Sequence, residues 1–145
     1  MRFVLENRIL LAAFAGWFLA QALKLAIELL RTHRLDFRYL VSTGGMPSAH
    51  SALVTALTTA VARENGLGSS VFAVCAVFAA IVMYDAAGVR QAVSIQARIL
   101  NRMLDEIFTQ HAFSERRLRE LLGHTRLEVF VGFVLGLIVG FVATM

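Results

Sequence analysis

The chain has little of several residue types, and each shortage excludes a class of protein or of partner. One cysteine among 145 residues, Cys75, makes an internal disulfide impossible. Lysine occurs once, as Lys24, and arginines clustered in predicted loops explain the net charge of +4, so we predict no nucleic-acid partner. Only 17% of the residues are charged and 58% are hydrophobic, with a mean hydropathy of +0.69. This composition excludes an ordinary soluble domain and predicts an integral membrane protein with a single domain over residues 1–145.

Long apolar stretches predict an all-α fold, a small bundle of about four transmembrane helices plus a cytoplasmic amphipathic helix. An α-helix needs about 20 mostly apolar residues to cross the hydrocarbon. The predicted spans cover about residues 9–30, 47–62, 70–89 and 127–143. The second span is short and rich in Ala, Ser and Thr, which favours close packing inside a bundle, so we predict that it is the central helix.

Glycine recurs at every fourth residue of the last predicted span, at Gly132, Gly136 and Gly140. Small residues at this spacing form a smooth helix face against which a neighbouring helix can pack closely. The neighbour is either another helix of the same chain or, in a homo-oligomer, a second copy of it.

The cytoplasmic amphipathic segment covers about residues 90–122 and begins with a helical pattern. One face carries Val89, Val93, Leu100, Leu104 and Phe108, and Arg90, Arg98, Asn101, Arg102 and Asp105 lie largely opposite. We expect this helix to lie along the bilayer surface or over the mouth of the bundle. A second short helix is predicted to begin after Ser114 and to stop at Gly123.

Basic residues predict which side of the membrane each loop faces. Arginines are frequent after the first and third spans, whereas only Arg63 lies between the second and third. Because basic loops face the cytoplasm, we predict an inner (plasma) membrane protein whose polar helix ends lie on the cytoplasmic side. Ionisable residues near membrane helices are costly and are therefore functional candidates. These residues are Lys24 with Arg31, Ser48 with His50, Asp85 with Arg90, and His124 with Glu128.

Residues 44–50 place two glycines, the only proline, a serine and a histidine at the start of the second span. Proline is tolerated in the first turn of a helix, so Pro47 predicts the helix start. No capping side chain stands directly before it, which would leave the N–H groups beside Ser48 and His50 open to a phosphate. The alternative is a Gly-Pro turn with an incidental histidine.

Lys24 and Arg31 are seven residues apart and lie on one face of the first predicted helix. Such a pair could clamp phosphate oxygens. Glu28 lies between them at helical spacing, so a salt-bridge stripe is the alternative. Two cations against one carboxylate leave a surplus positive charge, which favours the phosphate site.

The remaining candidates lie at the ends of the third and fourth spans. Asp85 precedes Arg90 by five residues, so that one could orient the other in a site or the pair could anchor the helix end. In a catalytic arrangement, Glu128 would accept the Nδ1–H of His124 and leave its Nε2 free for attack. In the structural alternative, Glu128 completes a capping box with Thr125.

Three motifs resemble the divergent branch of the type-2 phosphatidic acid phosphatases, membrane proteins related to acid phosphatases and vanadium haloperoxidases. The parent superfamily carries K-x6-R-P, P-S-G-H and S-R-x5-H-x3-D. Lys24 and Arg31 match the first spacing, with Thr32 in place of proline, and residues 47–50 match the second, with alanine in place of glycine. The third motif survives only as His124-x3-Glu128, because Leu118 stands where it would have arginine. Arg90 is our candidate to replace that arginine.

The resemblance implies a metal-independent lipid phosphatase without a cofactor. His124 would attack phosphorus to form a phosphohistidine, Glu128 would orient it, and His50 would protonate the departing oxygen and then activate water. The predicted phosphate-binding residues are Lys24, Arg31, Gly45, Ser48, Asp85 and Arg90. The expected partners are the membrane lipid and a phosphorylated lipid substrate. The alternatives are a carrier or flippase that binds phosphorylated headgroups without cleaving them, and a structural membrane protein.

Overall fold

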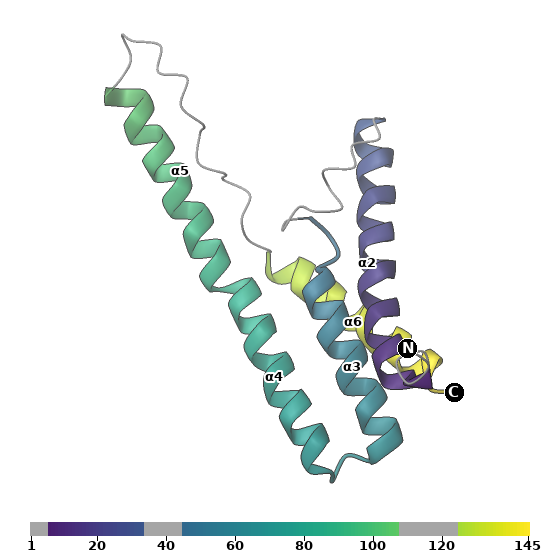
Figure 1. The fold of residues 1–145 in the computed structure, drawn as a ribbon. Coiled ribbons are helices and arrows are strands. Elements are labelled where there is room, and N and C mark those ends of the chain that lie inside the picture. The colour runs from purple at the N-terminus through teal and green to yellow at the C-terminus, as the bar shows by residue number, and fades with distance from the viewer. Residues whose placement is uncertain (1–5, 34–44, 108–124) are drawn as a thin grey trace.

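A computed structural model describes residues 6–33, 45–107 and 125–145, and within them the chain is helical with no strand (Figure 1). The helices are α2 (Arg8–Thr32), α3 (Ala49–Asn65), α4 (Ser70–Ala87), α5 (Val89–Ile107) and α6 (Arg126–Ala143). The predicted all-α fold is confirmed, and the observed bounds of α2, α3, α4 and α6 lie within three residues of the predicted spans. Four of the helices begin at a side chain that accepts a backbone N–H, from Asn7, Ser48, Ser69 and Thr125.

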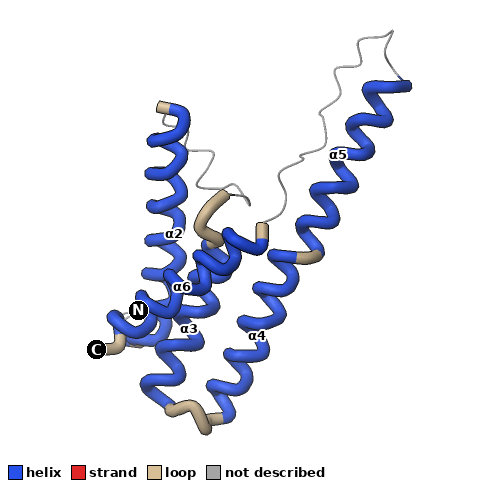
Figure 2. The backbone as a smooth tube through the Cα atoms, turned by 180° about the vertical axis from the view of Figure 1, so that it is seen from behind, coloured by secondary structure: helices blue, strands red, loops and turns tan. Residues whose placement is uncertain are grey.

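Three of these helices are long and apolar enough to cross a membrane: α2, α4 and α6. Helix α3, which was also predicted as a span, has 17 residues and carries more hydroxyl side chains than the other helices. It is nevertheless the central helix, as predicted, because it packs against α2, α4 and α6 (Figures 1 and 2). A helix surrounded by other helices can be less apolar than its neighbours, since little of its surface meets lipid.

Small residues allow the helices around α3 to approach its backbone closely. A Cβ added to Gly136 of α6 would lie 2.6 Å from the carbonyl oxygen of Ala52, and one added to Gly140 would lie 2.7 Å from that of Ala56. On the α2 side, a Cβ at Gly16 would lie 2.9 Å from the same Ala52 oxygen. The glycine face of α6 is therefore buried against α3 of the same chain, and the idea that a second copy packs on this face is wrong.

Helix α5 continues from the end of α4 and extends away from the other helices (Figures 1 and 2). Gly88 alone separates the two helices, and its N–H donates to the carbonyl of Tyr84 at 2.8 Å. Asn101, predicted to lie largely opposite the apolar face of α5, is only 5% exposed, beside Ala97 at 7%. One polar flank of the helix is therefore buried. Phe108 and the short helix predicted after Ser114 lie outside the described residues.

Candidate functional site

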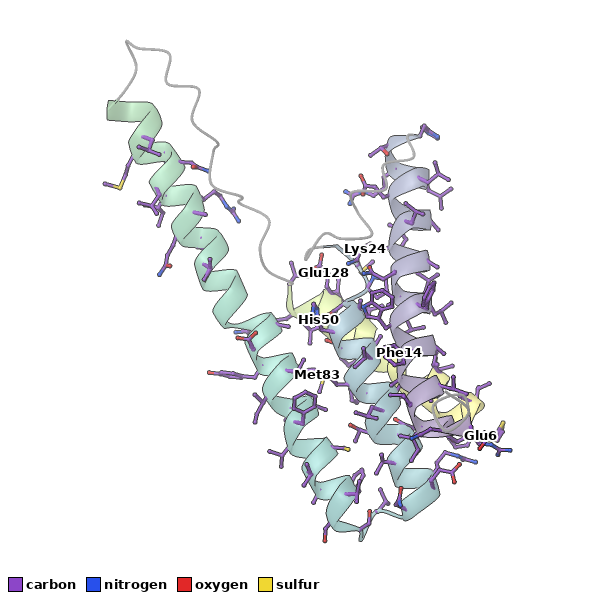
Figure 3. All side chains as sticks on the ribbon, in the orientation of Figure 1. Glu6, Phe14, Lys24, His50, Met83 and Glu128 are labelled. Atoms are coloured by element: carbon purple, nitrogen blue, oxygen red, sulfur yellow. The ribbon has the colours of Figure 1, made fainter. Side chains whose placement is uncertain are left out.

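The candidate residues come from helix ends that the fold brings to one end of the bundle. Helices α2 and α4 run in one direction, whereas α3 and α6 run in the other (Figure 1). The second half of α2, the start of α3, the end of α4 and the start of α6 therefore lie near one another. Figure 3 shows Lys24, His50 and Glu128 together in this region. We call Lys24, Gly45, Ser48, His50 and Glu128 the polar end cluster.

Gly45 packs directly on the side chain of Lys24. Its φ of +93° is a conformation that glycine adopts readily and other residues rarely do. A Cβ at this position would lie 3.4 Å from both Cγ and Cδ of Lys24. Lys24 itself is only 4% exposed. The loop before α3 thus covers the aliphatic part of Lys24, the only lysine in the chain. This contact brings the first predicted motif next to the second.

Ser48 joins the second motif to the third. It is fully buried, and its backbone N–H donates to the carbonyl oxygen of Glu128 at 3.0 Å. The Oγ of Ser48 accepts the N–H of Ser51 at 3.4 Å and the hydroxyl of Ser51 at 3.1 Å. The start of α3 is therefore held both by its own serine pair and by the first turn of α6.

These bonds correct the predicted start of the second span. Helix α3 begins at Ala49 with Ser48 as its N-cap, so Pro47 precedes the cap instead of standing in the first turn. The expectation of an uncapped first turn is wrong, because Ser48 Oγ already accepts the N–H of Ser51. The prediction treated Pro47 as the first helical residue and overlooked that the serine after it can cap the helix. Ser51 was also missed, although a serine three residues after an N-cap is visible in the sequence.

Glu128 completes the capping box that opens α6. Its Oε2 accepts the N–H of Thr125 at 2.7 Å, and its own N–H donates to the Oγ1 of Thr125 at 3.3 Å. The predicted capping box is thereby confirmed, and it does not exclude the orienting role that the sequence also predicts for Glu128. Glu128 lies at the same end of the bundle as Lys24, so opposite charges from α6 and α2 are within electrostatic reach of each other (Figure 3). Its predicted partner His124 lies outside the described residues.

His50 is the second residue of α3 and its side chain is exposed. Two contacts define how α3 passes α4: the hydroxyl of Thr58 donates to the carbonyl of Cys75 at 3.3 Å, and that of Thr55 lies 4.0 Å from Sδ of Met83. Because the helices are antiparallel, the same register brings His50 level with the last turn of α4. Asp85 lies in that turn.

Asp85 is half-buried, next to Ala86, which is 2% exposed and marks the packed face of α4. The carboxylate is therefore placed on the flank of the face that meets the bundle. The structure brings the end of α4 to the level of the polar end cluster. Asp85 therefore lies at the level of the cluster on the neighbouring helix.

Two further candidates are not placed in the cluster. Arg31 is exposed near the end of α2, seven residues and about 10 Å along the helix beyond Lys24. Arg90 belongs to the first turn of α5, but its side chain is not among those that the structure describes. Among the described residues, no group of three His, Cys, Asp or Glu side chains could hold a metal ion. The observed cluster thus offers one buried cation, serine hydroxyls, a carboxylate and an imidazole.

Membrane-spanning helices around a short polar central helix, with ionisable residues gathered at one end, define a small helical membrane protein. The chain belongs to the divergent PAP2 family, which it matches over residues 5–139. This match confirms the resemblance to divergent type-2 phosphatidic acid phosphatases. The chain is also 43% identical over 146 residues to the uncharacterized membrane protein YuiD of Bacillus subtilis (strain 168), an alignment that covers 93% of this chain and 92% of that protein. No solved structure matches the chain.

Proposed function

We propose that this protein is a membrane phosphatase that hydrolyses a lipid phosphate or diphosphate through a phosphohistidine, without a metal ion. One observation carries the proposal: three segments far apart in the sequence meet at one end of the bundle. Lys24 contacts Gly45, and Ser48 donates to Glu128. These are the segments that carry the three phosphatase-like motifs.

The position of Lys24 supports phosphate binding. A buried ammonium group is costly unless opposite charge compensates it, and the nearby Glu128 supplies one carboxylate. A phosphate group would supply further negative charge and acceptor oxygens. Arg31, exposed farther along α2, would add a second cation once a headgroup is bound. The family membership supports this assignment, because phosphoryl transfer depends mainly on positioning and on charge stabilisation.

The proposed reaction has two steps. In the first, Nε2 of His124 attacks phosphorus, the bond from phosphorus to the lipid oxygen breaks, and protonated His50 donates its proton to that oxygen. In the second, neutral His50 takes a proton from water, the resulting hydroxide attacks the phosphohistidine, and phosphate leaves with His124 restored. His50 lies at the correct end of the bundle for this role (Figure 3). Thr125, the residue after His124, opens α6 in a capping box with Glu128, and the carbonyl of Glu128 accepts the N–H of Ser48.

We propose that the cluster lies at the cytoplasmic surface of the inner membrane. The helices that can cross a membrane, α2, α4 and α6, all have an end near it. The arginine-rich loops of the sequence follow α2 and α4 at this same end, as expected for loops that face the cytoplasm. A headgroup bound there would leave its hydrocarbon tail in the bilayer, which is why a lipid is the expected substrate.

The test is phosphate release by the full chain, purified into lipid nanodiscs, from a panel of lipid phosphates and diphosphates in the presence of a chelator. His50→Gln and His124→Gln should each lower the rate by a factor of about 10² or more. His33→Asn is the matched control, because His33 is exposed at the end of α2 with a positive φ that asparagine tolerates. Activity that required added metal, or that survived both histidine substitutions, would refute the mechanism.

One contact favours a non-catalytic carrier as the second candidate. The Oε2 of Glu128 is engaged by the N–H of Thr125, so part of the carboxylate expected to orient His124 has a structural role. A carrier would bind phosphorylated lipids without releasing phosphate. Its binding would depend on Lys24, Arg31 and Ser48 but not on either histidine. Lipid binding measured with the same histidine variants therefore distinguishes the two functions.

A further inference from the structure

Helix α5 exposes more apolar surface than an isolated helix in water tolerates. The exposed fractions of its large apolar side chains lie between 42% and 54%, for Val93, Ile95, Ile99, Leu100, Met103 and Leu104. One flank of the helix is covered, at Ala97 and Asn101. The broad apolar face beside that flank is uncovered by any described part of the chain. Contiguous exposed apolar surface of this kind marks a binding surface for a protein or a membrane.

The apolar face of α5 continues the lipid-facing side of α4. Val77 and Ile81 of α4 are each 61% exposed, as expected for side chains that meet lipid on a membrane helix. Ile95 and Ile99 of α5 follow them by 18 residues, which is five whole helical turns. Gly88, between the helices, keeps a right-handed helical conformation. The lipid-facing stripe of the span therefore runs on into α5 on the same side.

The length of α4 places the start of α5 at the membrane surface. Its 18 residues extend about 27 Å, which nearly equals the thickness of the hydrocarbon core. Tyr84, in the last turn, is 77% exposed, and tyrosine side chains are enriched where the hydrocarbon meets the headgroups. The first residue of α5 is thus expected at headgroup level, and a straight continuation would expose its apolar face to water.

We propose that α5 binds the surface of the bilayer, with its apolar face in the boundary between headgroups and hydrocarbon. A bend at Gly88, directed away from the bundle, would place α5 flat on the membrane surface. The side of α5 that continues the lipid-facing stripe of α4 would then face the bilayer. Ile99 and Met103 then enter the lipid, whereas Arg98, exposed on the opposite side of the helix, faces water. In this arrangement α5 anchors the chain beside the polar end cluster, whatever reaction that cluster performs.

The test measures depth in the membrane at two neighbouring positions of the full chain. In a Cys75→Ala background, which keeps the carbonyl that Thr58 contacts, a single cysteine is introduced as I99C or R98C and labelled with a fluorophore. The chain is reconstituted into phosphatidylcholine and phosphatidylglycerol vesicles that contain brominated lipid, or is exposed to aqueous iodide. The proposal expects several-fold stronger quenching by brominated lipid at position 99 than at position 98, and the reverse for iodide.

Two outcomes overturn the proposal. Equal and strong iodide quenching at both positions would show that α5 projects into water. Protection of position 99 from both quenchers, together with energy transfer between chains that carry donor and acceptor labels there, would show that a second copy covers the face. An additional pair, M103C and R102C, repeats the comparison if either of the first two variants folds poorly. Folding is checked by the fluorescence of Trp17, which packs on the core of the bundle.

Discussion

Replacing Gly136 with alanine should push α6 away from α3 and destabilise the bundle. The new Cβ would lie 2.6 Å from the carbonyl oxygen of Ala52 and 2.7 Å from the Cβ of Thr55, whereas ordinary contacts begin at 3.4 Å. One of these atoms belongs to the backbone, so a side-chain rotation cannot relieve the overlap. Overpacking of a tight core costs about 1–3 kcal/mol, and we expect the upper part of this range.

The single tryptophan provides the assay. Trp17 packs on the core formed by Ala20, Ala49 and Ala52, so its emission reports the packing of α2 on α3. Unfolding by a denaturing detergent, followed through this emission, gives the change in free energy between the variant and the parent. At about 1.4 kcal/mol per tenfold change in the equilibrium constant, a loss of about 2–3 kcal/mol corresponds to roughly a factor of 30 to 150.

Gly68→Ala is the matched control, because a Cβ at Gly68 would meet nothing within 4 Å. It lies in the turn between α3 and α4 and should leave the unfolding transition within about 0.5 kcal/mol of the parent. If Gly136→Ala were as stable as Gly68→Ala, with the same Trp17 emission, the close approach of α6 to α3 would be refuted. A stable variant would also mean that a second copy of the chain could pack against the glycine face of α6.

Three further substitutions test separate contacts. Thr125→Ala removes the capping box of α6 and should cost about 1 kcal/mol in the same unfolding assay; no change would mean that water replaces the cap. Arg63→Met removes a guanidinium that lies 4.1 Å from the ring centroid of Phe141, and should cost about 0.5–1 kcal/mol without changing any phosphatase rate. Lys24→Met keeps the aliphatic stem but removes the buried charge, so binding of lipid phosphate should fall at least about tenfold. Arg8→Gln, at the opposite end of α2, is its control, and equal binding by both variants would remove Lys24 from the site.

The sequence alone determined the membrane class, the family, and the order and approximate bounds of α2, α3, α4 and α6. Hydropathy depends only on composition over about 20 residues, which is why the helix bounds agree closely with those predicted. The central position of α3 could also be predicted from the sequence, because a membrane helix rich in Ala, Ser and Thr packs best among other helices. Family membership follows from similarity over residues 5–139, which is likewise a property of the amino-acid sequence and not of its packing.

Only the tertiary structure decided how the motifs meet and which alternative holds at each helix end. The Gly45 contact with Lys24 and the Ser48 bond to Glu128 join residues far apart in the chain, and such contacts depend on the approach of whole helices. The cap at Ser48 was not predicted, whereas the capping box at Glu128 was predicted and is present. The glycine face of α6 could have met α3 or a second copy, because a smooth face fits any close neighbour. Helix packing within one chain resolved that choice, since α3 already covers the face.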